Sequence, residues 1–299
     1  MKHITATYLV VGPLAYQILS DYPLAFDKAY LHFFQHHSPT REQGVRVMVD
    51  CEVKVVEEAI HLVGNNVYCD SSRSIYVTSD GMETRAFRFS DKSYAVCQEI
   101  SSRHLVLSLP KQCLVSGYVA VNIFFLEALM MERYMMECEG LILHSSFISH
   151  HDKSILFTAP SGTGKSTQAT LWEKYAGAEV INGDRSVVWY DDIEGRFMTS
   201  GLPFCGSSCI NKVRTIPLEC IVFISQSPEN HAEIMSASVA VRKIFGEVSV
   251  NKWNADFVER ALDLINRIVK SVTLVRLECN MEEEAVNTLR ALVESQKLP

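Results

Sequence analysis

The chain has 299 residues, which is enough for one large domain or two of ordinary size. Hydrophobic residues make up 47% of it, as in proteins with a packed core, and the net charge of −7 excludes the basic surface that nucleic-acid binding requires. The most apolar stretch, residues 114–131, has too many polar interruptions for a membrane span, so no association with a membrane is expected.

The nine cysteines are an odd number at scattered spacings, and the first residues lack the apolar stretch of a signal peptide. We therefore expect a reducing, cytoplasmic compartment. Cys205 and Cys209 lie close together, but no second pair of Cys or His has zinc-binding spacing. Ordinary thiols are the favoured interpretation of this pair, and a metal or redox role is the alternative.

Residues 1–113 alternate short runs rich in Val, Ile, Tyr and Phe with turn-forming residues, which is typical of β-strands. The expected strands are 4–11, 45–49, 74–78, 85–89, 94–98 and 105–109. A long buried helix is expected over 118–138, because its apolar residues run almost all the way round. Gly140 can end that helix. We therefore expect a β-rich domain over 1–138, whose role the sequence does not indicate, and a second domain over 139–299.

From residue 141 onward, strands and helices alternate, which indicates a mixed α/β (α+β) domain. The expected strands are 141–146, 154–158, 178–182, 186–190, 220–224 and 273–277. The expected helices are 166–175, 237–245, 256–269 and 282–295.

Residues 159–167 read Ala-Pro-Ser-Gly-Thr-Gly-Lys-Ser-Thr and lie between an expected strand and an expected helix, which is the arrangement of a phosphate-binding P-loop. Gly162 and Gly164 allow a tight turn whose N–H groups can point at phosphate oxygens, beside the positive end of the helix. Lys165 is expected to bridge the β- and γ-phosphates, and the Ser166 hydroxyl to hold Mg²⁺. The motif predicts binding of a nucleoside triphosphate; a chance glycine-rich turn is the alternative.

A P-loop needs a second metal ligand, normally an Asp at the end of a nearby apolar strand. Asp184 lies in this position and can bind Mg²⁺ directly or through water, although a turn Asp that caps the strand is the alternative. Arg185 could neutralise charge on a transferring phosphoryl group, or equally form a surface salt bridge. Lys212 and Arg214 could contact phosphates or an acidic acceptor, and a surface role is equally well supported.

Together these residues resemble the catalytic core of the HPr kinase/phosphorylase superfamily, which shares its P-loop fold with PEP carboxykinase. The matching features are His144 on the strand before the loop, the Ser-Gly-x-Gly-Lys-Ser form of 161–166, the Gly-Asp-Arg run 183–185, and the Gly-x-Pro-containing stretch 201–208. The resemblance covers roughly the C-terminal half of the chain.

The resemblance implies a PEP carboxykinase/HPr kinase-like P-loop catalytic domain behind the β-rich N-terminal region. It implies a kinase that uses ATP and Mg²⁺ to transfer the γ-phosphoryl group to a hydroxyl of a peptide, protein or small molecule, and it allows for a homo-oligomer. The implied catalytic residues are His144, Lys165, Asp184 and Arg185, and the metal ligands are Ser166 and Asp184. The implied ATP-binding residues are Pro160, Ser161, Gly162, Thr163, Gly164, Lys165, Ser166 and Thr167.

Two positions depart from the family pattern. Ala159 replaces the first glycine of the loop and is small enough to be tolerated. Gly183 stands where HPr kinases usually carry the first of two adjacent Asp residues. Either Asp184 must then do the work of both, or His144 must act more strongly as the base, provided that its side chain faces the site. The reverse phosphorylase reaction is in doubt for the same reason, and HPr itself is not expected as the substrate.

Two other functions remain open from the sequence. One is a non-catalytic nucleotide switch, or an ATPase, that regulates a partner. The other is a PEP carboxykinase-like lyase, which is less favoured because the chain is short and shows no second cluster of metal ligands.

Overall fold

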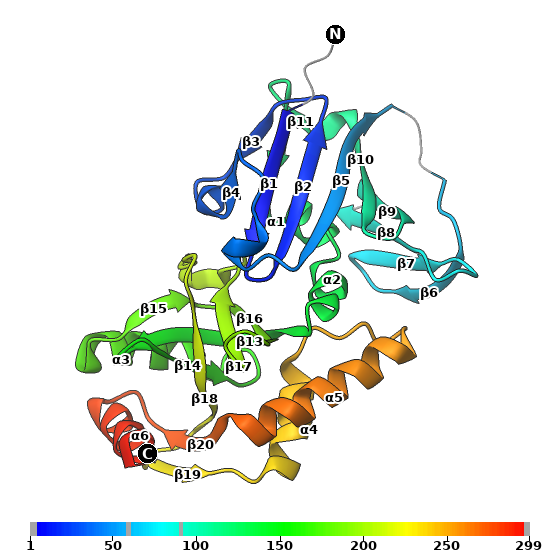
Figure 1. Cartoon of the computed structure of the whole chain (residues 1–299). Coiled ribbons are helices and arrows are strands. Elements are labelled where there is room, and N and C mark those ends of the chain that lie inside the picture. Colours follow the sequence, from blue (N-terminus) through cyan, green and yellow to red (C-terminus); the bar gives the residue numbers. More distant parts are fainter. Residues whose placement is uncertain (1–4, 58–60, 90–91, 296–299) are drawn as a thin grey trace. The chain divides into compact units, whose positions relative to one another are not determined.

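The computed structural model describes residues 5–57, 61–89 and 92–295 of the chain. The chain divides into two compact units, Met1–Tyr134 and Met135–Pro299. Both units are rich in β-sheet, and the described residues include six α-helices, so the structure is of the mixed α+β class (Figure 1).

The N-terminal unit is built almost entirely from strands. Its elements are β1 (Thr5–Val11), β2 (Leu14–Ser20), β3 (Leu24–Phe26), β4 (Phe34–Gln35), β5 (Val47–Val56), β6 (Asn65–Cys69), β7 (Arg73–Val77), β8 (Glu83–Phe89), β9 (Lys92–Ser101), β10 (His104–Pro110), β11 (Leu114–Val115), β12 (Tyr118–Val121), α1 (Ile123–Ala128) and α2 (Met131–Glu137), the last of which crosses the division between the units. The main sheet has the order β4-β1-β2-β5-β10-β9-β8-β7-β6, and β11, β12 and β3 form a smaller sheet. Ile4, which begins the first expected strand, lies outside the described residues.

The prediction of one long helix over 118–138 is wrong. The segment begins as strand β12 and continues as the two short helices α1 and α2. Asn122 separates β12 from α1, because its Oδ1 accepts hydrogen bonds from the N–H groups of Phe124 and Phe125, at 3.1 and 3.2 Å. Met130, with a φ of 52°, then separates α1 from α2. Strand β12 and helices α1 and α2 all contain buried residues. The apolar pattern of the segment therefore indicates burial, but it does not require one continuous helix.

A buried network of charged side chains lies in the N-terminal unit. Arg85 is only 1% exposed and pairs with Glu83 and, at 2.6 Å, with Glu132. Arg133 pairs with Glu99 at 2.7 Å. Burial acts to lower the pKa of the Arg85 guanidinium, but Glu132 and Glu83 raise it overall. These charges therefore compensate one another inside the unit.

The C-terminal unit alternates strands and helices. Its elements after α2 are β13 (Gly140–His150), β14 (Lys153–Thr158), α3 (Lys165–Ala176), β15 (Glu179–Asn182), β16 (Arg185–Asp191), β17 (Arg196–Gly201), β18 (Thr215–Gln226), β19 (His231–Ile234), α4 (Ala237–Glu247), α5 (Ala255–Ser271), β20 (Thr273–Cys279) and α6 (Glu283–Ser295). Strands β14, β18 and β20 are parallel neighbours, and the remaining pairings are antiparallel. The long strand β13 pairs first with β16 and then, from Ser145 onward, with β14 and β15.

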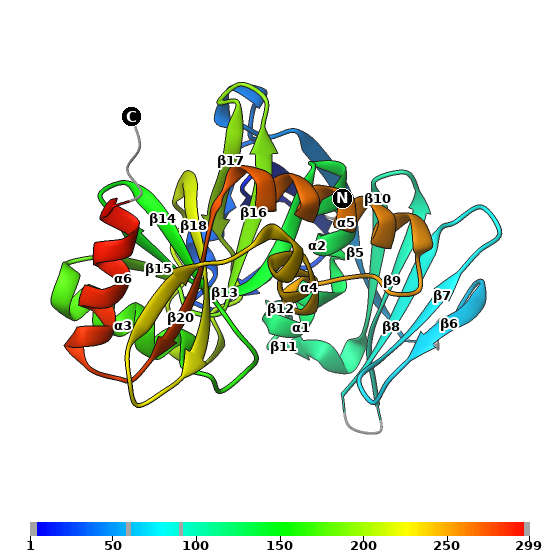
Figure 2. The same ribbon diagram turned by 90° about the horizontal axis from the view of Figure 1, so that it is seen from below.

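Helices cover both faces of the parallel strands. Helices α3 and α6 lie together on one side of the unit, and α4 and α5 lie together on the other (Figures 1 and 2). Successive residues of each strand face opposite sides: Phe157 packs in the cluster that contains Trp172 of α3, and Leu156 in the cluster that contains Ile265 of α5. Burial on both faces explains why these strands read as continuous apolar runs.

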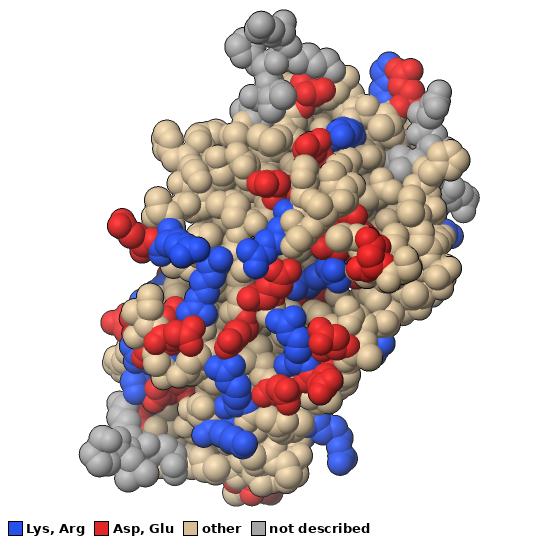
Figure 3. Space-filling model, turned by 45° about the vertical axis from the view of Figure 1, so that its right-hand side comes forward, with Lys and Arg blue, Asp and Glu red and all other residues tan. Residues whose placement is uncertain are grey.

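Acidic and basic side chains are interspersed on the face drawn in Figure 3, which carries no large patch of a single sign.

None of the described helices combines the length and the apolar character that crossing a membrane would require.

Candidate functional site

The expected loop lies at the carboxyl edge of the three parallel strands. Strand β14 ends at Thr158, and Gln226 and Cys279 end β18 and β20 as partners in register. In sheets with parallel strands, this edge is where ligands bind, because the connecting loops and the N-termini of the following helices meet there. The segments 159–164, 227–230 and 280–282 therefore converge on one side of the unit.

The conformation of the loop explains its two glycines. Gly162 and Gly164 have φ values of 80° and 114°, which residues other than glycine rarely adopt. A Cβ atom at either position would meet nothing within 4 Å, so the restriction lies in the backbone conformation and not in the space available. Ala159 is not among the positive-φ residues and packs, 4% exposed, in the cluster of Trp172. Alanine therefore suits the position of the missing glycine.

Lys165 begins α3 and is 6% exposed. Its Nζ donates to the carbonyl oxygens of Ala159, at 2.7 Å, and Pro160, at 3.4 Å. Burial lowers the pKa of the Lys165 ammonium, and the carboxylates of Glu247 and Asp184 partly oppose this shift. A buried cation next to a helix N-terminus is strongly favourable for anion binding.

A short polar cluster joins the start of α3 to the end of β15. Ser166 Oγ and Ser146 Oγ both donate to the carbonyl oxygen of Gly183, at 3.2 and 3.0 Å. Asn182, which is fully buried, accepts at its Oδ1 from the N–H groups of Asp184, at 2.9 Å, and Arg185, at 3.0 Å. This turn fixes the Asp184 carboxylate on the same side as Ser166.

The structure gives a reason for the glycine at position 183. A Cβ atom there would lie 1.9 Å from Ser208 Oγ and 2.4 Å from Ser208 Cβ. Ser208 is itself held by donating to Cys205 O at 2.6 Å. An Asp at position 183 would therefore require Ser208 to move. The packing of Ser208 against Gly183 explains why this loop carries a single Asp, Asp184.

His144 lies where β13 passes from its pairing with β16 to its pairing with β14. Its Nδ1 is 3.0 Å from Oε2 of Glu247, and its Nε2 is 3.7 Å from Oδ1 of Asp184. Glu247 is the last residue of α4, and its side chain is 16% exposed. Negative charge at a helix C-terminus is unfavourable, and the imidazole offers this carboxylate a hydrogen-bond partner.

A pocket of about 260 Å³ collects most of the expected site residues. Its walls include the side chains of His144, Lys165, Ser166 and Asp184, together with Ser161, Thr167 and the backbone of Gly162 and Gly164. Pro160 and Thr163 do not line this pocket. The side chain of Thr163 instead donates to Pro160 O at 2.8 Å and so closes the turn of the loop.

The expected cations outside the loop are engaged elsewhere. Arg185 does not line the pocket; its Nε lies 3.4 Å from Asp184 Oδ2, and its guanidinium lies over the ring of Phe204 at 5.3 Å. Lys212 and Arg214 both pair with Glu179. Arg185 can thus act on Asp184, whereas the other two form a surface cluster.

Sequence reasoning missed three members of the site: Ser146, Asn182 and Glu247. Asn182 follows from no motif, because its role is to hold backbone groups of its own turn. Glu247 lies more than a hundred residues from His144 along the chain, and only the packing of α4 brings the two together. The helix expected from the sequence ends at residue 245, so no local pattern marks Glu247 as part of the site.

Within the described residues, no group of three or more His, Cys, Asp and Glu side chains is placed to hold a metal ion. Mg²⁺ often needs fewer protein ligands, because it keeps several waters and takes one or two carboxylates together with substrate phosphates. Ser166 Oγ and the Asp184 carboxylate are oxygen ligands of this kind, and both line the pocket. The donor set fits a magnesium ion that arrives with a phosphate group.

No protein-family model matches the chain, and no curated protein matches its sequence. Among solved structures, the chain is similar to the Hpr(Ser) kinase/phosphatase from Coxiella burnetii, at 12% sequence identity and a TM-score of 0.29. The match covers 52% of this chain and 93% of that protein. A TM-score this low does not establish a shared fold.

Proposed function

We propose that the chain is an ATP-dependent, HPr kinase-like phosphotransferase that moves the γ-phosphoryl group to a hydroxyl on a peptide, protein or small molecule. The observation that carries this proposal is the pocket of about 260 Å³. It brings together a buried lysine, a helix N-terminus, a hydroxyl beside a carboxylate, and a histidine oriented by a second carboxylate. Phosphoryl transfer asks a protein for these parts: positioning, charge neutralisation and a proton acceptor.

The loop and Lys165 are suited to the phosphate chain. Loop N–H groups that follow two left-handed glycines form an anion-binding cradle. The Lys165 ammonium is held by its own loop through Ala159 O and Pro160 O, so it can exchange these carbonyls for phosphate oxygens without leaving the pocket. Because Lys165 is buried and little hydrated, its ammonium attracts the negative charge of a phosphate more strongly than an exposed lysine would.

Ser166 and Asp184 would hold Mg²⁺. When bound there, the ion would supply charge neutralisation at the transferring phosphate. The Ser166 hydroxyl is held by Gly183 O and the Asp184 backbone by the Asn182 turn, and both residues line the same pocket. Arg185 lies outside the pocket lining, and its Nε, 3.4 Å from Asp184 Oδ2, would orient that carboxylate.

His144 is the proposed base. Since a carboxylate accepts hydrogen bonds, Glu247 favours the imidazole with its proton on Nδ1, which leaves the Nε2 lone pair facing Asp184 and the pocket. The acceptor hydroxyl gives its proton to Nε2 as its oxygen bonds to phosphorus and the bond to the ADP oxygen breaks. The two carboxylates then stabilise the imidazolium that forms.

The test is the fate of a labelled γ-phosphate. The full chain is incubated with γ-labelled ATP and Mg²⁺ in the presence of peptides, proteins and small hydroxyl compounds of a host extract, with Lys165→Ala as the control. We expect label on an acceptor with the wild type and not with the variant. ADP formation without transfer to any acceptor would instead support the ATPase or switch alternative and would contradict a kinase.

A further inference from the structure

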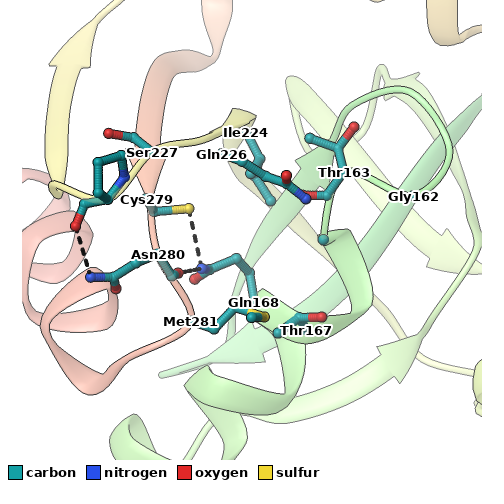
Figure 4. A pocket seen from close by; sticks show the side chains of 12 residues that line it. Gly162, Thr163, Thr167, Gln168, Ile224, Gln226, Ser227, Cys279, Asn280 and Met281 are labelled. Carbon is teal, nitrogen blue, oxygen red and sulfur yellow. Dashed lines mark hydrogen bonds between the residues drawn. The ribbon is translucent and has the colours of Figure 1, made fainter.

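A second pocket, of about 510 Å³, adjoins the first (Figure 4). Gly162, Gly164 and Thr167 line both pockets, so the two share a wall made by the loop and the first turn of α3. The rest of the second pocket comes from the ends of β18 and β20 and the residues that follow them. A ligand that lies along the loop can therefore reach into both pockets at once.

The two pockets differ in charge. The first contains His144, Lys165 and Asp184, whereas none of the twelve residues that line the second carries a charged side chain. Ile224 and Cys279 give it a buried apolar wall, at 7% and 5% exposure. The second pocket therefore suits a neutral, partly apolar group and not a phosphate or a carboxylate.

Met281 adds an apolar side chain at the rim that is 73% exposed. An apolar side chain left in water beside a pocket gains from any flat ligand that covers it, and a thioether packs well against aromatic rings. Figure 4 shows Met281 on the side of Asn280 and Cys279, across the pocket from Gln226 and Thr163.

Polar groups in this pocket are placed to orient a ligand. Gln168 is 2% exposed, and its Nε2 donates to Asn280 O at 3.0 Å and to Cys279 Sγ at 3.2 Å. Its Oε1 is buried and has no hydrogen-bond partner among the described residues. The side chain of Gln226 donates a long hydrogen bond from Nε2 to Thr163 O, at 3.4 Å. Gln168 thus fixes the wall formed by Cys279 and Asn280, and the weakly engaged amide of Gln226 is the group that a ligand carbonyl or hydroxyl would meet.

We infer that this second pocket is the nucleoside subsite, which takes the neutral base and sugar of the nucleoside triphosphate whose phosphate chain lies along the loop. The inference rests on the proposed function and adds a direction to it. The second pocket shares none of His144, Ser166 and Asp184 with the first. The terminal phosphate therefore faces His144, and the acceptor enters by the first pocket, opposite the nucleoside.

The test compares two probes by calorimetric titration of the full chain in the presence of Mg²⁺. Inorganic tripolyphosphate reports the phosphate site alone, and ATP reports both pockets. We expect ATP to bind more tightly than tripolyphosphate. Met281→Ser should weaken ATP binding roughly twofold to tenfold and leave tripolyphosphate binding unchanged, because the thioether contact is made only with the base. Met281→Phe should preserve or increase the preference for ATP.

Ile193→Ser is the matched control, because Ile193 is 94% exposed in the turn between β16 and β17 and lines neither pocket. It should change neither affinity. Equal affinities of the wild type for ATP and tripolyphosphate, unaffected by Met281→Ser, would overturn the nucleoside subsite and leave the phosphate site standing. Failure of both probes to bind would overturn the proposed function and this inference together.

Discussion

The two units place their charged side chains in opposite ways. In the N-terminal unit, Arg85 is buried among carboxylates that compensate it, and the network is closed. In the C-terminal unit, the buried Lys165 donates to two carbonyl oxygens of its own loop and lies at the wall of a pocket. The first arrangement can stabilise a fold, and the second keeps a cation ready for an anion from outside. Two cations of similarly low exposure are therefore compensated by carboxylates in one unit and placed at a pocket wall in the other.

The largest expected effect comes from opening the closed network. Arg85→Ala removes the cation shared by Glu83 and Glu132 and leaves Glu83 the longer contact to Arg133, at 3.7 Å, which should cost about 3–5 kcal/mol of stability. The loss should appear as faster hydrogen exchange in β8 and β9 in the full chain. Arg85→Met, which fills the space but cannot pair, should be about as damaging. Unchanged exchange in both variants would mean that the network contributes nothing to the unit.

Removing the open cation should have the opposite signature. Lys165→Ala should lower ATP turnover by about 10²–10³-fold, as when one charge-stabilising group is taken from a transition state. The melting temperature should stay the same or rise, because a cation whose burial lowers its pKa is costly to keep folded. ADP formation and thermal unfolding of the same preparation separate the two effects. A variant that unfolds as readily as Arg85→Ala would break the contrast between the units.

Glu247 is an intermediate case. Its carboxylate acts on the charge of Lys165, and it also orients His144, the candidate base. Glu247→Gln keeps the shape but lets the amide present either a donor or an acceptor to His144. Turnover should fall about 10- to 100-fold, which is part of the 10²–10⁴-fold that proton transfer to a positioned side chain contributes. A purely structural residue would lower stability without altering the pH profile of turnover. We expect the pH profile to shift while tripolyphosphate still binds, because the loop and Lys165 remain in place.

The smallest effect concerns the pH dependence of ATP affinity. Burial lowers the pKa of the Lys165 ammonium, so it loses its proton at a lower pH than an ordinary lysine, whose value is 10.5. Only the charged form attracts phosphate, so ATP affinity should fall as the pH rises through that lowered pKa. Lys165→Arg keeps its charge and should show no such fall. Loss of the proton removes a buried charge, so the fold should gain stability over the same range, which separates lost affinity from unfolding.

The sequence predicted the local parts of the site better than the distant ones. Gly162, Gly164 and Lys165 lie within one short motif whose spacing carries the backbone geometry, and the structure places the loop between β14 and α3. Glu247 comes from α4, and no local pattern announces its contact with His144. Side-chain contacts between elements far apart in the chain depend on packing, which a single sequence does not display.

The fold shows the same limit. The apolar pattern over 118–138 indicated burial correctly but not its geometry, because the Asn122 cap and the left-handed Met130 interrupt it. Short strands such as β4 and β11 have two residues each and carry no detectable alternation. At Gly183 the sequence showed a departure from the family pattern, and only the position of Ser208 shows why a side chain does not fit.

The most direct measurement is a calorimetric titration of the wild-type chain and of Lys165→Ala with ATP in the presence of Mg²⁺. If the open charge of the C-terminal unit is a phosphate site, the wild type binds one ATP per chain, and the variant binds it far more weakly while remaining folded. Equal affinity in the two proteins, or no binding by the wild type, would contradict that assignment and with it the proposed phosphotransferase.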